Sequence, residues 1–377
     1  MSRIVQVANF VTPTSGGLKT ALHHLAVGYA DRGHEVVQVL PGTHDEVEQM
    51  PWGTRVLLES RAVPGTGYRV HTNLKRLEQQ LAGIAPDRLE VHDRTTLRGL
   101  GRWASGHGVP SLVVSHERLD VWLHQWIPRR FPMGRHADRS NAALAGMFDD
   151  VVCTTRWAAE EFERLGVQNL RRVPLGVDLT GFPPRLHRGE GDELLLVMVS
   201  RLSREKRCDL AVECVRELVR RGRKARLLVA GDGPMRSSLE KQAHGLPVHW
   251  LGFVTDRAEL AALMAAADIA LAPGPVETFG LAALEALACG TPAVVNRHSA
   301  LPEVIGDTAG RTSASSGFVF ADAVEDLQLE DELERRHAAR DRAETFSWDA
   351  TAEGFLDVHR LLHRQVGTPA RRVDTAA

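Results

Sequence analysis

Two carboxylates stand eight positions apart in a stretch framed by glycine and proline. Glu277 follows Gly274-Pro275, and Glu285 precedes a Gly-Thr-Pro stop at 290–292. If a helix begins at Phe279, Glu277 lies just before its first turn and Glu285 about a turn and a half inside. Free backbone N–H groups at such a helix start favour a sugar or phosphate beside Glu277. The alternative is a carboxylate that only favours the helix dipole, followed by an exposed glutamate.

Two cations form a second candidate group. Arg201 and Lys206 lie in the run 200–207, directly after a predicted strand. In an open parallel sheet, ligands bind past the carboxyl ends of the strands. An arginine holds two oxygens at once and a lysine is a mobile point charge, so the pair suits a diphosphate whose negative charge grows as it leaves. The alternative is a solvated basic loop that caps the next helix.

Glycine loops follow other predicted strands. Gly16 and Gly17 would let a ligand approach the next helix, but they lack the G-x-G-x-x-G spacing and a plain turn is favoured. Gly231 opens a similar loop, and the run 252–256 supplies a flat aromatic or apolar shelf that could receive a nucleobase. Asp256 could accept hydrogen bonds from a purine, and it also fits a helix N-cap.

His116 follows a predicted strand in the first half of the chain. A histidine at the carboxyl end of a strand can contact a sugar hydroxyl or stabilise developing positive charge. A lone histidine is more often an ordinary loop residue, and the chain has 17. Its place at the predicted cleft edge favours a functional role. Asp93-Arg94 has a similar position on weaker grounds.

Aromatic residues alternate with arginines in the run 122–132. This pattern suits a lipid–water interface or an amphipathic acceptor. A helix that packs its tryptophans into the domain explains the pattern equally well. The residues concerned are Trp122, Trp126, Arg129, Arg130 and Phe131.

The elements that must position these residues alternate between strand and helix. In the first half, the predicted strands are 4–8, 36–40, 89–91, 111–115 and 151–154, and the predicted helices are 18–30, 71–84, 97–107 and 156–165. In the second half, the predicted strands are 194–200, 227–230, 248–251, 269–272, 293–295 and 318–320, and the main predicted helices are 208–221, 257–267 and 281–289. Two successive alternations predict an α/β chain of two Rossmann-like domains, each with a mainly parallel sheet.

A break in the pattern near residue 178 divides the chain. We expect residues 1–178 to form the first domain, 179–192 a linker and 193–346 the second domain. Residues 347–366 are expected to form a helix that crosses back to the first domain, and 367–377 a disordered tail.

The composition disfavours several classes of protein. A hydrophobic content of 43% and a charged content of 25% are typical of a soluble globular protein. The net charge of −2 gives no global attraction to nucleic acid. The four cysteines form no C-x-x-C pair, which disfavours a zinc site and a secreted disulfide scaffold. With no apolar run of about 20 residues, the expected location is the cytoplasm.

Taken together, these stretches resemble the GT-B glycosyltransferases of family 4. Glu277 and Glu285 look like the family's E-x7-E signature. The runs 5–10, 115–120, 152–155 and 271–275 are similar to the actinobacterial GDP-mannose-dependent mannosyltransferases that extend phosphatidylinositol mannosides. The resemblance covers nearly the whole chain. It implies two domains facing a cleft and the transfer of mannose from GDP-mannose, with retention, to a hydroxyl of a lipid-linked glycan.

The resemblance also implies roles for individual residues. Glu277 and His116 contact the sugar, and the backbone of Phe279, Gly280 and Leu281 holds the sugar and the phosphates. Glu285 binds the ribose, and Val254 and Asp256 lie near the base beside Gly231. Arg201 and Lys206 hold the diphosphate, which Gly16 and Gly17 approach from the first domain. No metal or other cofactor is implied, and the enzyme is expected to be cytoplasmic, with peripheral contact to the inner membrane face through residues 122–131.

Two other functions remain open from the sequence. One is a family 4 enzyme that uses another nucleotide sugar and a soluble small-molecule acceptor. The other is a catalytically silent nucleotide-sugar-binding protein. This function is disfavoured, because every charged residue that the mechanism needs is present. The resemblance implies front-face attack by the acceptor with the donor phosphate as base, and the sequence leaves open whether Glu277 forms a covalent intermediate.

Overall fold

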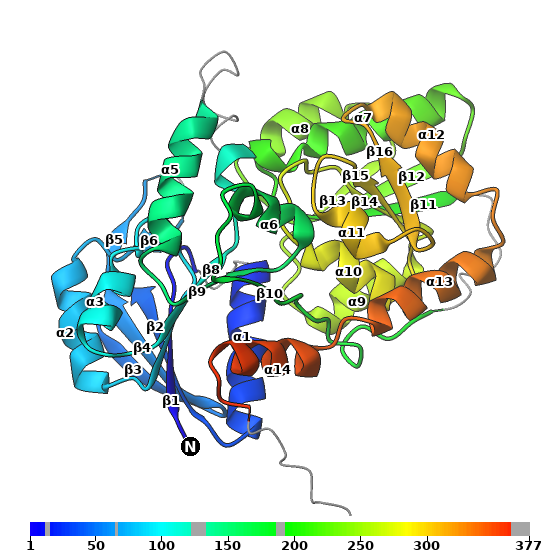
Figure 1. Ribbon diagram of the computed structural model, residues 1–377. Coiled ribbons are helices and arrows are strands. Elements are labelled where there is room, and N and C mark those ends of the chain that lie inside the picture. Colours follow the sequence, from blue (N-terminus) through cyan, green and yellow to red (C-terminus); the bar gives the residue numbers. More distant parts are fainter. Residues whose placement is uncertain (12–15, 65–66, 122–132, 186–192, 363–377) are drawn as a thin grey trace, which may run out of the picture.

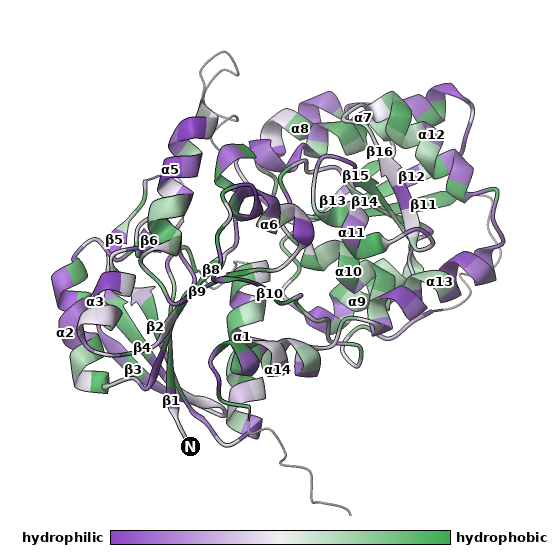
Figure 2. Cartoon of the chain, viewed as in Figure 1, coloured by the Kyte–Doolittle hydropathy of each residue, from purple (hydrophilic) through white to green (hydrophobic). Residues whose placement is uncertain are grey.

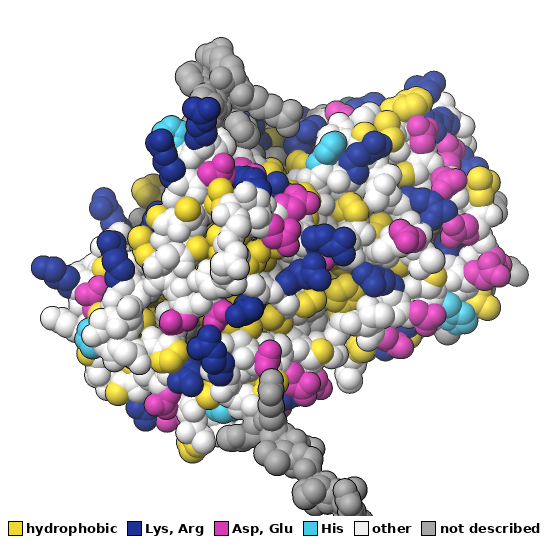
Figure 3. Space-filling view, in the orientation of Figure 1, with side chains coloured by type: hydrophobic (Ala, Val, Ile, Leu, Met, Phe, Trp, Pro, Cys, Tyr) yellow, Lys and Arg dark blue, Asp and Glu magenta, His cyan; other side chains and the backbone are white. Residues whose placement is uncertain are grey.

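Two parallel sheets, each covered by helices, organise the chain (Figure 1). The computed structural model describes residues 1–11, 16–64, 67–121, 133–185 and 193–362. Hydrophobic residues concentrate in the central strands and hydrophilic ones on the outward helix faces (Figure 2). Charged side chains of both signs are interspersed over the face shown in Figure 3, in keeping with the small net charge.

The first sheet has eight strands in the order β10-β9-β8-β7-β1-β2-β4-β3, and every pair is parallel except the β3–β4 hairpin at one edge. Its central strands are runs of valine, leucine and isoleucine, as expected for strands buried on both faces. The strands are β1 (Arg3–Val7), β2 (Glu35–Gly42), β3 (Glu46–Met50), β4 (Gly53–Glu59), β7 (Arg88–Val91), β8 (Ser111–Ser115), β9 (Asp150–Cys153) and β10 (Leu170–Arg172). Its helices are α1 (Gly17–Asp31), α2 (Leu74–Ile84), α3 (Leu100–Gly106), α5 (Met133–Ala145) and α6 (Arg156–Glu163). A small separate hairpin pairs β5 (Arg61–Ala62) with β6 (Arg69–Val70).

The second sheet has six parallel strands in the order β13-β12-β11-β14-β15-β16. They are β11 (Leu194–Val199), β12 (Ala225–Ala230), β13 (Val248–Gly252), β14 (Ile269–Ala272), β15 (Ala293–Asn296) and β16 (Gly310–Ser313). The helical elements are η1 (Arg204–Lys206), α7 (Cys208–Arg220), α8 (Arg236–Gln242), α9 (Arg257–Ala266), α10 (Leu281–Ala288), α11 (Leu301–Ile305), α12 (Gly317–Leu327) and α13 (Glu332–Glu344). This is the doubly wound strand order, in which successive strands are added on one side up to β13 and on the other side from β14, so the strand order reverses between β11 and β14.

The last described helix, α14 (Trp348–Val358), packs against α1 of the first sheet (Figure 1). The contact is close, because a Cβ added at Gly28 of α1 would lie 2.5 Å from the Cβ of Ala352. Phe355 and Leu356 join the hydrophobic core around Tyr29. The chain end therefore helps to bury the first sheet, although it follows the second.

The structure corrects one predicted strand. Residues 318–320 belong to helix α12, because Phe320, Val324 and Leu327 share one buried helix face against α7. Phe318, in contrast, is 54% exposed. A short apolar run fits either a strand or a buried helix. Here the helical spacing of the apolar residues that follow it along the chain favours a helix. The last strand of the second sheet is β16 instead, whose sequence Gly-Arg-Thr-Ser carries no apolar signal.

Candidate active site

The predicted site residues of the second domain lie at one edge of its sheet. Arg201 and Lys206 follow β11, and Glu277 follows β14. These two strands flank the point where the strand order reverses, which is where open α/β sheets bind ligands. Gly231 follows β12 at the same edge, with a φ of 141° and its Cβ position 1.9 Å from the carbonyl oxygen of Ser200. Only glycine fits this close crossing of two loops.

Lys206 and Glu277 form an ion pair at this reversal point. The Lys206 Nζ lies 2.5 Å from the Glu277 Oε1, and the two side chains are 27% and 22% exposed. Burial lowers the pKa of Lys206, but the Glu277 carboxylate raises it more, and the net pKa is above its ordinary value. The ammonium is therefore charged at neutral pH and remains accessible to an anionic ligand.

Helix α10 begins at Leu281, two residues later than a start at Phe279. Gly280 is its N-cap and has a φ of 82°, the left-handed conformation that favours glycine. The Phe279 side chain is buried edge-on against Phe346, with ring centroids 5.9 Å apart. Leu281 is also buried. These side chains anchor the loop in the core, which leaves only their backbone for a ligand.

Glu285 lies within α10 and is 13% exposed. Burial raises the pKa of this carboxyl to about 7, although Arg257, whose Nη2 is 3.7 Å away, opposes the shift. Asp178 raises the pKa further. Glu285 is therefore poised to change protonation state near neutral pH when its surroundings change.

The first domain brings His116 to this site. The Thr278 hydroxyl donates a hydrogen bond of 2.6 Å to the carbonyl oxygen of His116. The Thr155 hydroxyl donates one of 2.8 Å to the carbonyl oxygen of Thr278. On the same interface, the Glu303 carboxylate accepts the backbone N–H of Arg156 at the start of α6. The loop of Glu277 is thus bonded directly to the first domain.

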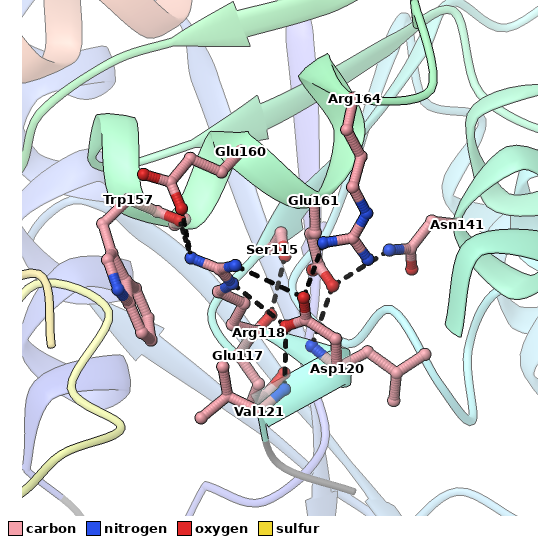
Figure 4. A network of polar contacts seen from close by, with 12 residues as sticks. Ser115, Glu117, Arg118, Asp120, Val121, Asn141, Trp157, Glu160, Glu161 and Arg164 are labelled. Carbon is pink, nitrogen blue, oxygen red and sulfur yellow. Dashed lines mark hydrogen bonds and ion pairs between the residues drawn. The ribbon is translucent and has the colours of Figure 1, made fainter. Parts of the chain in front are cut away.

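A polar network holds the segment that carries His116 (Figure 4). Arg118 bonds to Asp120 and to Glu160 of α6, at 3.0 and 2.6 Å. The buried Glu161 accepts the backbone N–H of Leu119 at 3.0 Å and pairs with Arg94. The segment after β8 is therefore fixed against α6 by charged groups. Arg94 is buried among these partners and bonds to Glu161 and Asn141, which gives it a structural role. The weaker prediction for Asp93-Arg94 stays a prediction.

Tyr68 is a candidate site residue that the sequence did not indicate. Its hydroxyl accepts a hydrogen bond of 2.6 Å from Arg201, whose guanidinium also stacks over the Tyr68 ring at 4.8 Å from the centroid. Tyr68 stands just before β6 in the first domain, 133 residues from Arg201. Only the packing of the two domains brings this phenol to Arg201, the predicted diphosphate-binding residue.

The remaining predicted residues take simpler positions. Gly16 and Gly17 form the start of α1, and a Cβ at Gly17 would lie 3.5 Å from the Leu281 side chain, so the two helix starts meet. Asp256 is the N-cap of α9 and accepts the N–H of Ala258 at 2.8 Å, as expected. Val254, half-buried, lies beside it.

Some predictions concern residues outside this description. Trp122, Trp126, Arg129, Arg130 and Phe131 all lie outside the described residues. Within the described part of the chain, no group of three or more His, Cys, Asp or Glu is placed to hold a metal ion. None of the helices in the described residues is long and apolar enough to cross a membrane.

Comparison with known proteins places this geometry in a family. The family described as glycosyl transferase 4-like domain matches residues 16–177, and glycosyl transferases group 1 matches residues 186–346. A GDP-mannose-dependent alpha-(1-6)-phosphatidylinositol dimannoside mannosyltransferase of Mycobacterium tuberculosis is 46% identical over 94% of this chain and 95% of its own. The chain belongs to the GT-B glycosyltransferases of family 4.

More distant relatives share the glycosyltransferase fold. The sulfoquinovosyl transferase of Arabidopsis thaliana is 28% identical over 93% of this chain and 72% of its own. Among solved structures, the sucrose-phosphate synthase from Thermosynechococcus elongatus superposes with a TM-score of 0.79 at 20% identity, covering 96% of this chain and 98% of that one. This glycosyltransferase is therefore an α/β protein of GT-B architecture, as the sequence predicted.

Proposed function

We propose that this glycosyltransferase moves mannose from GDP-mannose, with retention of configuration, to a hydroxyl of a lipid-linked glycan such as a phosphatidylinositol mannoside. The observation that carries the reaction type is the Lys206–Glu277 pair at the reversal point of the second sheet. The donor and acceptor are proposed from the mycobacterial relative, whose name specifies GDP-mannose and a phosphatidylinositol dimannoside.

Each charged group has a place in the proposed reaction. The bond between the anomeric carbon and the phosphate oxygen breaks, and its electron pair goes to the departing diphosphate. Lys206 and Arg201 stabilise this negative charge. Glu277 accepts hydrogen bonds from hydroxyls of the transferred sugar, and His116 contacts the same sugar from the first domain. The acceptor oxygen attacks the same face, and its proton passes to the departing phosphate.

The nucleotide is proposed to lie along the second domain. The carboxyl of Glu285 binds the ribose hydroxyls, and the backbone of residues 279–281 holds the phosphates. Gly16 and Gly17 approach the diphosphate from the first domain. Gly231, Val254 and Asp256 line the place of the base. No metal or other cofactor is part of the proposal.

The acceptor is proposed to reach the enzyme at the cytoplasmic face of the membrane. The aromatic and basic residues Trp122, Trp126, Arg129, Arg130 and Phe131 would make the peripheral contact. Flotation with anionic liposomes checks this point, because replacing these residues should abolish binding to lipid without changing the binding of GDP. Efficient mannosylation of a soluble acceptor, with no binding to liposomes, would favour the alternative substrate class.

A thermal-shift panel of GDP, UDP, ADP and dTDP sugars tests the donor. A ligand at 100 times its Kd stabilises the folded protein by about 2.7 kcal/mol, and we expect GDP-mannose to give the largest shift. Transfer of labelled mannose then tests the reaction. Lys206→Ala should lower kcat by about 10²–10³, the usual cost of losing one group that stabilises developing charge. Unchanged transfer in both Lys206→Ala and Glu277→Ala would overturn the assignment.

A further inference from the structure

A carboxylate lies fully buried inside the first domain, behind the proposed sugar site. Glu90 of β7 is 0% exposed, yet among the residues that the structure describes no lysine or arginine is bonded to it. Its Oε1 accepts from the Tyr29 hydroxyl at 2.5 Å and the His359 Nε2 at 2.7 Å. Its Oε2 accepts from the Gln6 amide at 2.8 Å and the His92 Nε2 at 3.3 Å. Four donors thus fill the four acceptor positions of one carboxylate.

These donors decide the charge of Glu90. Burial by itself raises the pKa of the carboxyl, but the hydrogen bonds from His359 and His92 hold it well below its ordinary value. An ionised carboxylate only accepts hydrogen bonds. The proton of His92 that faces Glu90 is therefore on Nε2.

The other nitrogen of His92 points toward the site. The His92 Nδ1 lies 3.0 Å from the Nε2 of His116, and the two rings stack with centroids 5.3 Å apart. Glu90 lies in β7 and His92 directly follows the strand, so the bond from His92 to Glu90 and the contact from His92 to His116 form one line toward the site. Because the His92 Nε2 donates to Glu90, a His92 ring that carries one proton has Nδ1 as its acceptor. His116 must then donate from Nε2.

This arrangement leaves the Nδ1 of His116 without a proton, so its lone pair can accept a hydrogen bond. Burial lowers the pKa of His116 to about 3, so the ring is neutral at physiological pH. Among the described residues, none forms a hydrogen bond with this Nδ1. The carbonyl oxygen of the same residue meets the Thr278 hydroxyl, next to Glu277. The free nitrogen thus belongs to a residue that the domain interface holds at the proposed sugar site.

We propose that Glu90 and His92 are positioning residues that fix His116 in the tautomer with its proton on Nε2, so that Nδ1 accepts a hydrogen bond from a hydroxyl of the donor sugar. The inference rests on the proposed function only for the identity of the ligand. A fixed acceptor orients the sugar and contributes no proton to the reaction. Its counterpart in other enzymes is the carboxylate that holds a catalytic histidine in one tautomer.

Two substitutions at position 92 separate the two bonds of this residue. An asparagine amide reaches about as far as the Nδ1 of histidine, so His92→Asn keeps a partner for His116 and loses Glu90. A glutamine amide reaches about as far as Nε2, so His92→Gln keeps Glu90 and loses His116. Tyr29→Phe is the matched control, because it removes a donor from the other oxygen of Glu90 and leaves the path to His116 intact.

The tautomer is read directly by long-range ¹H–¹⁵N NMR of the histidine rings in the full-length protein without substrate. We expect His116 to carry its proton on Nε2 in the wild type and in Tyr29→Phe, and to show mixed tautomers in His92→Gln. In His92→Asn, whose amide is no longer oriented by Glu90, the fraction with the proton on Nε2 should lie between these two results. A proton on Nδ1 of His116 in the wild type would overturn the inference. This measurement does not require activity, so its failure is distinct from a failure of the proposed function.

Kinetics of mannosyl transfer give the second readout. His92→Gln should lower kcat by roughly 10- to 100-fold, the usual cost of losing a residue that orients a ligand group, with the KM for the acceptor unchanged. His92→Asn should recover part of this loss, and Tyr29→Phe should retain wild-type kcat. Equal losses in His92→Gln and Tyr29→Phe would show that these changes act on the fold alone, and the inference would be wrong.

Discussion

The Thr278 hydroxyl of the second domain donates a hydrogen bond of 2.6 Å to the carbonyl oxygen of His116 in the first. The two residues are 162 positions apart. Thr278 directly follows Glu277, so this bond connects the loop of Glu277 to the strand end that carries His116. The proposed site is complete only when the two domains are in contact.

Replacing Thr278 by valine removes this bond with little change in volume. A typical intramolecular hydrogen bond contributes about 0.5–1.5 kcal/mol, so we expect kcat/KM for mannosyl transfer to fall roughly 2- to 10-fold. Thr345→Val is the control, since its hydroxyl bonds to the carbonyl of Arg342 on an exposed helix end away from the site. Equal effects of the two changes would argue against a role for the interdomain bond.

The raised pKa of Glu285 makes the stability of the ligand-free protein depend on pH. The unfolded chain loses this proton near pH 4.5 and the folded protein near pH 7. The stability gained from the buried, protonated carboxyl is fully present below pH 4.5 and is lost as the pH rises through about 7. We therefore compare the free energy of unfolding of Glu285→Gln with that of the wild type. This difference should shift in favour of Glu285→Gln by roughly 3 kcal/mol between pH 4.5 and pH 8.

Urea unfolding of both proteins at several pH values measures this difference. Burial also raises the pKa of Glu117 to about 7, but this group is present in both proteins and cancels in the comparison. Stabilities that change in parallel with pH would show that Glu285 is ionised in the folded state at pH 5.

The same carboxyl should link nucleotide binding to pH. If the ionised form accepts the ribose hydroxyls, binding of GDP must release the proton of Glu285. The affinity for GDP should then rise about 5-fold as the pH increases from 6 to 7, and only about 2-fold more above pH 7. Calorimetry in buffers of different ionisation enthalpy detects the released proton. Glu285→Gln should bind more weakly and show no such dependence.

Gly280 should not tolerate a side chain. Its φ is 82°, and an added Cβ would lie 2.3 Å from the Cδ2 of Leu301. We expect Gly280→Ala to destabilise the protein by about 1–3 kcal/mol and to weaken donor binding, because the backbone that starts α10 must shift. In Gly83→Ala, the new Cβ meets no atom within 4 Å in helix α2, and this change should stabilise by about 0.5–1 kcal/mol. Thermal or urea unfolding compares the two.

The thiols should be unreactive in the folded protein. Cys153, Cys208, Cys214 and Cys289 are all buried and free. Burial raises the pKa of the Cys153, Cys208 and Cys289 thiols to about 12, so their thiolate fraction at neutral pH is negligible. Titration with a thiol reagent should detect no reactive group until denaturant is added. Rapid reaction under native conditions would show that the core opens locally.

Local sequence patterns were sufficient for much of this protein. The alternation of apolar strands and amphipathic helices predicted the two parallel sheets, because each period reflects one face that must be buried. The positions of Arg201, Lys206 and Glu277 at strand ends predicted their shared edge, because parallel strands end together. The same logic failed at residues 318–320, where a short apolar run fits either type of element.

The tertiary structure alone decided which distant groups meet. Tyr68 contacts Arg201, Glu90 contacts His359, and Thr278 contacts His116, each across more than a hundred residues. No period or motif marks these partners, since a buried hydrogen bond depends on the packing of whole elements and not on neighbours in the chain. The sequence by itself determined the family and the central strands of the two sheets, and it indicated the charged residues of the candidate site. The packing of the two domains determined how those residues are oriented and which protonation states they hold.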